Sequence, residues 1–406
     1  MRQGSGRCVR AGLLGFCLGV GALLMVTEET EAAPAGKTPD GFVETGFDAL
    51  PGWADDNHAD ALSAFLRFCR SSGTLLSKGP IRLSAERADE ICKNALAAEG
   101  AGNAAARAFF EAEFVPHVID AKGFVTGYYE PELAASRTQS GAFPAPLLKA
   151  PEGLVQITSS NRPRNWPEEL SHGRQTAKGI VPLPDRPAIM AGALAEEGLD
   201  LVYLSDPVEA FFVHVQGSAR LRLTDGAAMR VGYAGKTGHP YTSVARVLVN
   251  RGEGTPEQLT MTGLRKWFVD NPDRRDELLG QNRSYIFFRE VEIEDPKDGP
   301  IGAAGLPLVA GRSLAVDLAH LSLGLPIFLE TSLSDVKDLS DVEGLTADLR
   351  RLVIADDTGS SIKGAARGDL FVGSGLAAGR IAGDIRHAAR MTVLLPKSAR
   401  SERGNR

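Results

Sequence analysis

Two aspartates near the C-terminal end of the chain stand where they could do acid–base chemistry. Asp357 follows the apolar run 352–355 and enters a turn at 358–360, and Asp369 precedes a second apolar run, 370–372. Two strands that each present a carboxylate beside small residues can form a site, because glycine lets a substrate approach the backbone. The local pattern alone leaves a second interpretation open, which is a pair of ordinary turns with solvated aspartates.

Composition limits the class of protein that could carry such a site. The chain has 406 residues, of which 43% are hydrophobic and 24% charged, as expected for a globular chain with two or three cores. A formal net charge of -6 argues against nucleic acid as a partner. No Cys-x-x-Cys or His-x-x-x-His pair occurs, so the sequence predicts neither a metal site nor a cofactor.

The N-terminal segment 1–35 is predicted to be a signal peptide. Three arginines among the first ten residues precede an uncharged run over 11–26, and an A-x-A cleavage site follows at 33–35. The run is short for a membrane span, which needs about 20 residues, and a retained anchor is the alternative. Phe16 stands before Cys17 where a lipoprotein signal has a small residue. We therefore expect an exported, periplasmic protein without a lipid anchor, for which association with the outer membrane stays open.

Two cysteines remain once the signal peptide is removed, and they predict one disulfide. Cys69 and Cys92 lie in the helix-like segments 61–70 and 84–98. An even number of cysteines in an exported chain favours a disulfide, because the compartment is oxidising. Two buried thiols are the alternative.

The secondary structure that must position these residues is expected to change along the chain. We expect a flexible lead-in over 36–55, a helical region over 56–115, and short strands from Phe124 onward. The expected strands include 201–204, 210–215, 220–223 and 285–290, the expected helices are 241–252, 255–270 and 272–280, and a last β-rich block, 304–396, precedes a basic disordered tail, 397–406. Strands without regular helix alternation favour a β-barrel or sandwich over a doubly wound sheet.

Two short motifs suggest chemistry that the rest of the sequence does not support. The segment D-T-G-S at 357–360 is typical of aspartic proteases, which need two such loops facing each other, and the chain has one. The glycines of 373–379 resemble a dinucleotide loop, but the third glycine comes one residue late and no strand–helix–strand unit surrounds it. A strand followed by a helix start is the favoured interpretation there.

Two other segments carry side chains suited to an uncharged polymer. The segment 213–220 alternates as a half-buried strand should, with His214 packed or at the surface, and Gln216 and Ser218 could bind a polymer through amide and hydroxyl groups. Tyr128 and Tyr129 could stack on sugar rings or simply pack in a core.

Taken together and in order, six segments resemble the MltA family of lytic murein transglycosylases. They are T-G-Y-Y-E-P (126–131), V-Q-G-S (215–218), Y-A-G-K-T-G-H-P-Y (233–241), V-D-L-A-H-L-S-L-G-L-P-I-F (316–328), D-T-G-S-S-I-K-G (357–364) and D-L-F-V-G-S-G (369–375). The resemblance covers about 120–396. The family's C-terminal part is named the 3D domain for three aspartates, which correspond here to Asp317, Asp357 and Asp369.

The resemblance implies a mainly β fold with α-helices, built as a double-psi β-barrel with a second domain inserted into it. The barrel with its N-terminal helices would comprise 36–131 and 296–396, and the inserted β-rich domain 132–295. The glycan groove would lie where the two meet. Its substrate-binding residues would be Tyr128, Tyr129, Gln216, Gly217, Ser218 and Lys363.

The resemblance also implies a reaction and a catalytic residue. The family cuts the β-1,4 bond between N-acetylmuramic acid and N-acetylglucosamine without water, leaving a 1,6-anhydro ring. One carboxyl group, Asp369, would serve as both acid and base, whereas ordinary glycosidases use two. Asp357 and Asp317 would shape the site. The expected partners are peptidoglycan strands, with peripheral contact to the outer membrane or to wall-synthesis proteins, for a chain expected to be a monomer.

The sequence leaves two other functions open, and it departs from the family pattern at one place. A non-catalytic module that only binds peptidoglycan and an aspartic protease are the alternatives. Family members often carry an acidic residue in the small loop after Gly375, and 376–379 contains none. The rate or the substrate preference of this chain could differ for that reason.

Overall fold

The computed structural model describes residues 41–71, 75–292, 298–342 and 344–397. The predicted signal peptide and all but the first residue of the predicted basic tail lie outside these ranges. The described chain is mixed α/β with mostly sheet content. None of the helices in this part of the chain combines the length and the apolar composition that crossing a bilayer demands.

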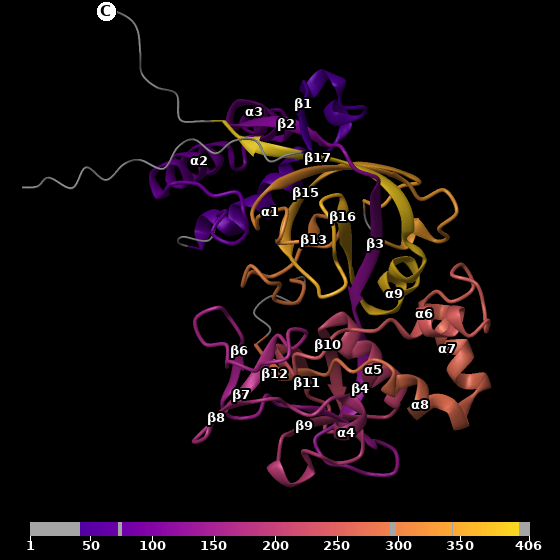
Figure 1. Cartoon of the computed structure of the whole chain (residues 1–406). Helices are drawn as coiled ribbons and strands as arrows, with labels where there is room; N and C mark the ends of the chain where they lie inside the picture. The colour runs from indigo at the N-terminus through magenta and orange to yellow at the C-terminus, as the bar shows by residue number, and fades with distance from the viewer. Residues whose placement is uncertain (1–40, 72–74, 293–297, 343, 398–406) are drawn as a thin grey trace, which may run out of the picture. The chain divides into compact units, whose positions relative to one another are not determined.

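The larger sheet collects strands from both ends of the chain (Figure 1). In spatial order it consists of β1 (Phe42–Glu44), β2 (Phe114–Ile119), β17 (Arg386–Pro396), β14 (Pro326–Ser332), β15 (Asp348–Asp357), β13 (Ser313–Val316), β16 (Arg367–Ser374) and β3 (Gly123–Glu130). Strand β3 pairs in parallel with β16 and also antiparallel with β17. The six strands from β17 to β3 therefore close into a ring of pairings.

The second sheet is built from the middle of the chain. Its order is β12 (Ile286–Val291), β11 (Ala228–Lys236), β10 (Ser218–Leu223), β4 (Glu132–Ser136), β9 (Asp200–Leu204) and β5 (Ala145–Leu148). A three-stranded sheet of β6 (Leu154–Gln156), β7 (His172–Thr176) and β8 (Gly179–Val181) accompanies it. Pro131 alone separates β3 from β4, so the chain passes directly from the larger sheet into the second.

The helices fall into three groups along the chain. The first group is α1 (His58–Arg70), α2 (Ala85–Ala98) and α3 (Asn103–Glu113), the second is α4 (Arg186–Met190), α5 (Pro207–Gln216), α6 (Val244–Asn250), α7 (Met261–Asp270) and α8 (Arg275–Gly280), and α9 (Gly375–Asp384) follows β16. A disulfide between Cys69 and Cys92 joins α1 to α2, the pairing that the sequence predicts.

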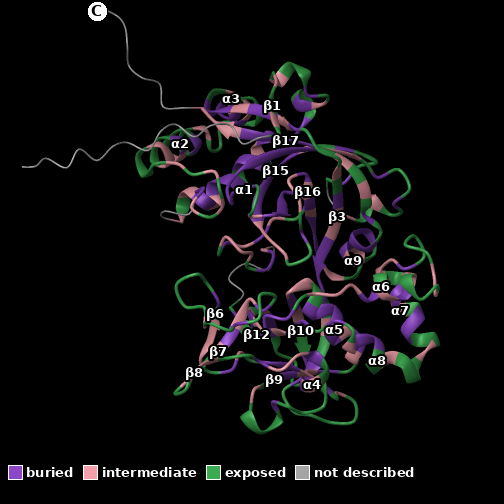
Figure 2. Cartoon of the chain, in the orientation of Figure 1, coloured by how far each residue is buried: buried purple, intermediate pink, exposed green. Residues whose placement is uncertain are grey.

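Burial follows these groups (Figure 2). The main core joins helices α1 to α3 with the larger sheet through fully buried side chains such as Phe65, Phe110, Phe328 and Leu352. A separate core lies on the second sheet, and a third gathers around α5, α6 and α7. Each sheet therefore has its own hydrophobic core, which gives the residues at their junction two rigid supports.

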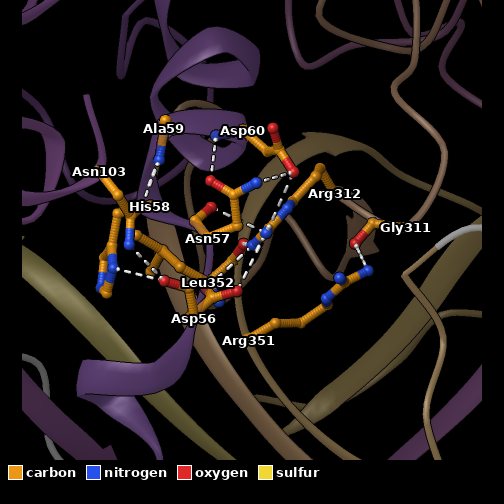
Figure 3. A network of polar contacts seen from close by, with 10 residues as sticks. All are labelled: Asp56, Asn57, His58, Ala59, Asp60, Asn103, Gly311, Arg312, Arg351 and Leu352. Carbon is orange, nitrogen blue, oxygen red and sulfur yellow. Dashed lines mark hydrogen bonds and ion pairs between the residues drawn. The ribbon is translucent and has the colours of Figure 1, made fainter. Parts of the chain in front are cut away.

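A buried ion pair fastens the start of α1 to the larger sheet (Figure 3). The two Asp56 carboxylate oxygens accept hydrogen bonds from Arg312 Nη1 and Nη2 at 2.9 and 3.0 Å, and Leu352 N–H donates to Asp56 Oδ2 at 2.7 Å. Arg312 also donates to the carbonyls of Asn57 and Leu352. A bidentate pair of this kind fixes both partners in one geometry.

One predicted strand is wrong. Residues 210–215 belong to helix α5, so the strand-like alternation over 213–220 misassigns its first half. Asp206 Oδ1 accepts the N–H of Val208 at 2.7 Å, a proline follows at the first helical position, and Gly217 ends the helix at φ 83°. These are helix start and stop signals. The helix packs against two cores, so nearly all its positions are apolar and the helical period is hidden.

The flexible lead-in expected over 36–55 is also wrong where the structure describes it, because Phe42–Glu44 forms β1 paired with β2, and Trp53 is buried in the main core. Strands therefore begin before Phe124, and most of the remaining predicted elements agree with the structure within a few residues. Strands expected over 201–204, 220–223 and 285–290 are confirmed as β9, β10 and β12. The helix expected from residue 255 begins at Met261, because the reciprocal hydrogen bonds of Thr255 and Gln258 close a separate turn. His214 is buried against aromatic rings, as its packed interpretation predicts.

Candidate active site

Asp369 lies beside Thr126, where β16 runs parallel to β3. The strand register places the two residues opposite each other, and the Thr126 hydroxyl donates a hydrogen bond to Asp369 Oδ1. Arg367 lies two residues earlier on the same face of β16. Its Nη2 donates to Thr126 Oγ1 at 2.7 Å. The threonine hydroxyl thus stands between the guanidinium and the carboxylate and orients both.

The surroundings of Asp369 favour its protonated form. The residue is half-buried. Burial raises the pKa of Asp369 to about 6, the hydrogen bond from Thr126 and the charge of Arg367 lower it, and the charge of Asp357 raises it. A carboxyl group whose pKa approaches neutrality can give up and take back a proton within one reaction.

Asp357 is held by two hydrogen bonds. Tyr128 donates its hydroxyl proton to Asp357 Oδ2 at 2.9 Å, and Ala303 N–H donates to Oδ1 at 2.8 Å. Burial raises the pKa of Asp357, while these contacts oppose the increase. The Tyr128 ring packs on Phe371 with 5.3 Å between centroids. Both oxygens of Asp357 therefore have protein partners, which suits a residue that shapes the site.

Asp356 is a buried carboxyl group that the sequence analysis did not single out. Successive residues of a strand face opposite sides, so Asp356 points into the core while Asp357 faces the site. Its Oδ2 accepts a hydrogen bond from the Ser313 hydroxyl. Burial holds the pKa of Asp356 well above its ordinary value. A doubled aspartate at the end of an apolar run was the only signal in the sequence.

Asp317 closes the loop that joins β15 to β16. Its two oxygens accept the N–H groups of Ala319 at 3.1 Å and Gly364 at 2.8 Å. Lys363 Nζ lies 3.6 Å from Asp317 Oδ1, with 71% of the lysine side chain exposed. Burial alone would raise the pKa of Asp317, but the two N–H groups and the Lys363 charge together lower it. Asp317 therefore stays ionised and holds backbone.

The tyrosines and Gln216 meet at the junction of the two sheets. Tyr128 and Tyr129 are only 9% and 6% exposed, which leaves little of either ring for a sugar. Gln216 Oε1 accepts the Tyr129 N–H at 3.0 Å, and the Tyr129 hydroxyl accepts from Arg265 at 3.1 Å. Gly217 takes the left-handed conformation that ends α5, and Ser218 is buried at the start of β10. The structure therefore brings these predicted residues together through hydrogen bonds and packing between β3, α5 and β10.

A cavity of about 220 Å³ adjoins the Asp369 strand pair. It is lined from β3, α5, α6 and the segment before it, α7, α9 and the start of β17, by residues that include Thr126, Gly127, Phe212, Tyr241, Met261 and Arg386. Burial raises the pKa of Tyr241, and the charge of Asp369 adds to that increase, so the tyrosine lies in the electrostatic field of Asp369. Among the described residues no cluster of three or more His, Cys, Asp or Glu could hold a metal ion.

Glu130 is a second buried carboxylate that the sequence analysis missed. It pairs with Arg220 at 2.8 Å and with Arg230 at 3.0 Å, and Ser374 donates to it at 3.0 Å. Glu130 ends β3 and Ser374 ends β16, whereas the arginines belong to β10 and β11. The cluster therefore ties the strands of the candidate site to the second sheet. Its arginines lie far from Glu130 in sequence, so no local pattern marked them.

Comparison with known families finds two matches. Residues 124–289 match the MltA specific insert domain, and residues 312–395 match the 3D domain. The membrane-bound lytic murein transglycosylase A of Escherichia coli K12 is 32% identical over 271 residues, which are 66% of this chain. The match spans 64% of the length of that relative.

Solved structures resemble this chain over more of its length. The crystal structure of a membrane-bound lytic murein transglycosylase from Agrobacterium tumefaciens is 39% identical, with a TM-score of 0.77, covering 88% of this chain and 98% of the other. The structure of E. coli MltA with bound chitohexaose is 26% identical, with a TM-score of 0.64, covering 89% and 98%.

Proposed function

Because the chain belongs to the MltA family of lytic murein transglycosylases, we propose that it cuts the β-1,4 bond between N-acetylmuramic acid and N-acetylglucosamine in peptidoglycan. Asp369 first gives its proton to the glycosidic oxygen as the bond to the muramic acid C1 breaks. The O6 hydroxyl of the same sugar then bonds to C1, and the Asp369 carboxylate takes the O6 proton. The product ends in a 1,6-anhydro ring, no water is consumed, and Asp369 is restored.

The observation that carries this proposal is the environment of Asp369. Its pKa of about 6 lets one carboxyl group serve as acid and then as base at near-neutral pH. Thr126 donates to one carboxylate oxygen of Asp369, and the Arg367 guanidinium donates to the Thr126 hydroxyl. A direct bidentate pair would stabilise the charged form and weaken the acid.

The remaining residues position the substrate and the acid. We assign Asp357 and Asp317 to holding the loop around the site, on the strength of their hydrogen bonds to Tyr128 and to backbone N–H groups. The glycan would run along the wall formed by Tyr128, Tyr129, Gln216, Gly217, Ser218 and Lys363, in which the two buried tyrosine rings support the surface and do not stack on sugars. Gln216 would offer its amide N–H groups, since its oxygen is taken by Tyr129.

The finer architecture belongs to the same proposal. The ring of six paired strands supports a double-psi β-barrel formed by 36–131 and 296–396. The second sheet, whose strands lie between residues 132 and 291, supports an inserted domain over 132–295. Bound chitohexaose in the E. coli relative supports a sugar polymer as ligand. Export by the segment 1–35, residence in the periplasm as a monomer, and peripheral contact with the outer membrane or wall-synthesis proteins complete the proposal.

Mass spectrometry of the products tests the reaction. Purified peptidoglycan sacculi are digested with the mature chain, and the soluble muropeptides are weighed. Anhydro-muropeptides, lighter by one water than hydrolysis products, are the expected result. Hydrated products would show that the chain is a hydrolase and not a transglycosylase. Binding to sacculi without release of muropeptides would indicate a module that only binds peptidoglycan. Peptide fragments without sugar cleavage would favour the protease.

A further inference from the structure

Two lysines gather beside the loop that joins Asp357 to the Asp369 strand. Lys236, the last residue of β11 in the second sheet, donates from Nζ to the Ser360 hydroxyl at 3.0 Å. Lys363 lies three residues beyond Ser360 in the same loop. The charge of Lys363 helps to lower the pKa of Lys236, after burial, so the two ammonium groups lie in each other's field.

The positive charge of this pair is only partly balanced. Over the described ranges, Lys236 makes no ion pair with a carboxylate, and its hydrogen-bond partner is a neutral hydroxyl. Lys363 approaches Asp317 at 3.6 Å, but that carboxylate is already shared with two backbone N–H groups. Two cations gathered at one loop without a full counter-charge are expected to attract an anion.

The backbone that follows Lys236 is held in place by its contacts, which restricts the positions that the lysine side chain can reach. The next residue, Thr237, is fully buried, and its N–H donates to the Tyr285 carbonyl at 3.0 Å. Gly238 follows at φ 90° and packs so closely on His172 that a Cβ there would lie 2.4 Å from the His172 nitrogen. A lysine on such a segment loses less conformational entropy on binding a ligand than a lysine on a flexible loop would.

We propose that Lys236 and Lys363 form an anion subsite that binds a carboxylate carried by the muramic acid substituent of the glycan. This inference rests on the proposed function, because it uses the same groove and the same polymer. The carboxylate has two sources, the peptide stem or, in strands stripped of peptides, the free lactyl group. A neutral chito-oligosaccharide has neither, so this subsite separates muramic acid polymers from other glycans of the same linkage.

Binding measurements with three ligands test the subsite. The parent chain carries Asp369→Asn so that strands stay intact, and the ligands are a chito-oligosaccharide, glycan strands with peptide stems, and strands stripped by an amidase. We expect Lys236→Met to weaken binding of a carboxylate-bearing ligand about tenfold, and Lys363→Met about threefold because that lysine is exposed. Binding of the chito-oligosaccharide by Lys236→Met should not change. Lys236→Arg should restore most of the affinity.

Lys266→Met is the matched control, since Lys266 is an exposed lysine of α7 paired with Asp270. A loss confined to strands with stems identifies the stem carboxylate, and a loss confined to stripped strands identifies the lactyl group. Equal affinities of the Lys236 and Lys266 variants for both kinds of strand would overturn the subsite. A parent chain that binds none of the three ligands would instead overturn the proposed function, and the subsite with it.

Discussion

Asp56 contacts the larger sheet and Asp369 lies in one of its strands, and the surroundings of the two aspartates make them opposites. Asp56 is 7% exposed and receives two guanidinium hydrogen bonds from Arg312 and one backbone N–H (Figure 3). Asp369 is half-buried, and its nearby arginine reaches it only through the Thr126 hydroxyl. The direct pairing with Arg312 holds the Asp56 carboxylate in one position. At Asp369 a hydroxyl lies between the carboxyl group and the arginine, so the carboxyl group can still exchange its proton.

The same substitution, aspartate to asparagine, should therefore have opposite consequences at the two positions. Asparagine keeps the size of the side chain and removes the charge and the transferable proton. At Asp369 this removes chemistry, and at Asp56 it removes one half of a buried ion pair. Comparing the two variants for activity and for stability separates a reacting group from a structural one.

The largest expected effect is on the activity of Asp369→Asn. General acid–base assistance contributes about 10²–10⁴-fold, and loss of the sole proton donor should reach or exceed that range. The measurement is the release of anhydro-muropeptides from sacculi. Asp357→Asn is the internal comparison and should lose less, because Asp357 only holds Tyr128 and backbone. An active Asp369→Asn beside an inactive Asp357→Asn would move the catalytic role to Asp357.

The same variant should not lose stability at neutral pH. The pKa of Asp369 is about 6 in the folded chain against an ordinary value of 3.8, so folding favours the protonated form. As pH rises between these two values, the contribution of Asp369 to stability falls, and above both the ionised group opposes folding. The substituted asparagine side chain carries no charge, so thermal unfolding of Asp369→Asn at pH 7 should occur at an equal or higher temperature than in the parent. A marked loss would show that the ionised carboxylate is structural.

The next effect in size is the stability of Asp56→Asn. Removing one partner of a buried ion pair typically costs about 3–5 kcal/mol, because it leaves Arg312 charged and poorly compensated. We expect the midpoint of denaturant unfolding to fall by a corresponding amount, with activity per folded molecule retained. Asp55→Asn, at the exposed neighbouring position, serves as the control and should be near neutral. Equal stability of the two variants would contradict a structural role for the pair.

The disulfide supports α1 at the other end and should matter somewhat less. Cys69 and Cys92 are 23 residues apart in sequence, and closing a loop of that size contributes roughly 3 kcal/mol through the entropy of the unfolded chain, an account that depends on the model used. The double variant Cys69→Ser, Cys92→Ser should unfold at lower denaturant than the oxidised parent and match the reduced one. Reductant that leaves the stability of the parent unchanged would contradict this expectation.

The sequence predicts local elements well where signals lie close together. Strands β9, β10 and β12 follow from apolar runs between turn residues, and the pairing of Cys69 with Cys92 follows from elimination and compartment. The sequence of helix α5 resembles a strand because side chains of the helix are buried in two cores. Its start at Asp206-Pro207 and its stop at Gly217 were the more reliable signals.

The partners of the candidate site could not be read in the same way, since they depend on register between distant strands. Thr126 and Asp369 are 243 residues apart in sequence, and they come into contact because β3 pairs with β16. Asp56 and Arg312, separated by 256 residues, meet for the same kind of reason. Arg367 alone was within reach of local reasoning, because it lies on the same face of the strand as Asp369.

The smallest expected effect concerns the pH dependence that Arg367 sets. Since the proposed first step needs protonated Asp369, kcat/KM should fall about tenfold per pH unit above a pKa of about 6. The charge of Arg367 lowers that pKa, so Arg367→Gln should move the falling limb to higher pH by a fraction of a unit, and Arg367→Lys should move it back. Arg390→Gln, on β17 beside Glu330, is the control and should leave the limb in place. If Arg367→Gln lowers kcat/KM at every pH but leaves the falling limb of the pH profile in place, Arg367 only orients Thr126. The hydroxyl between the two charges would then be a positioning device and not the means by which the arginine tunes the acid.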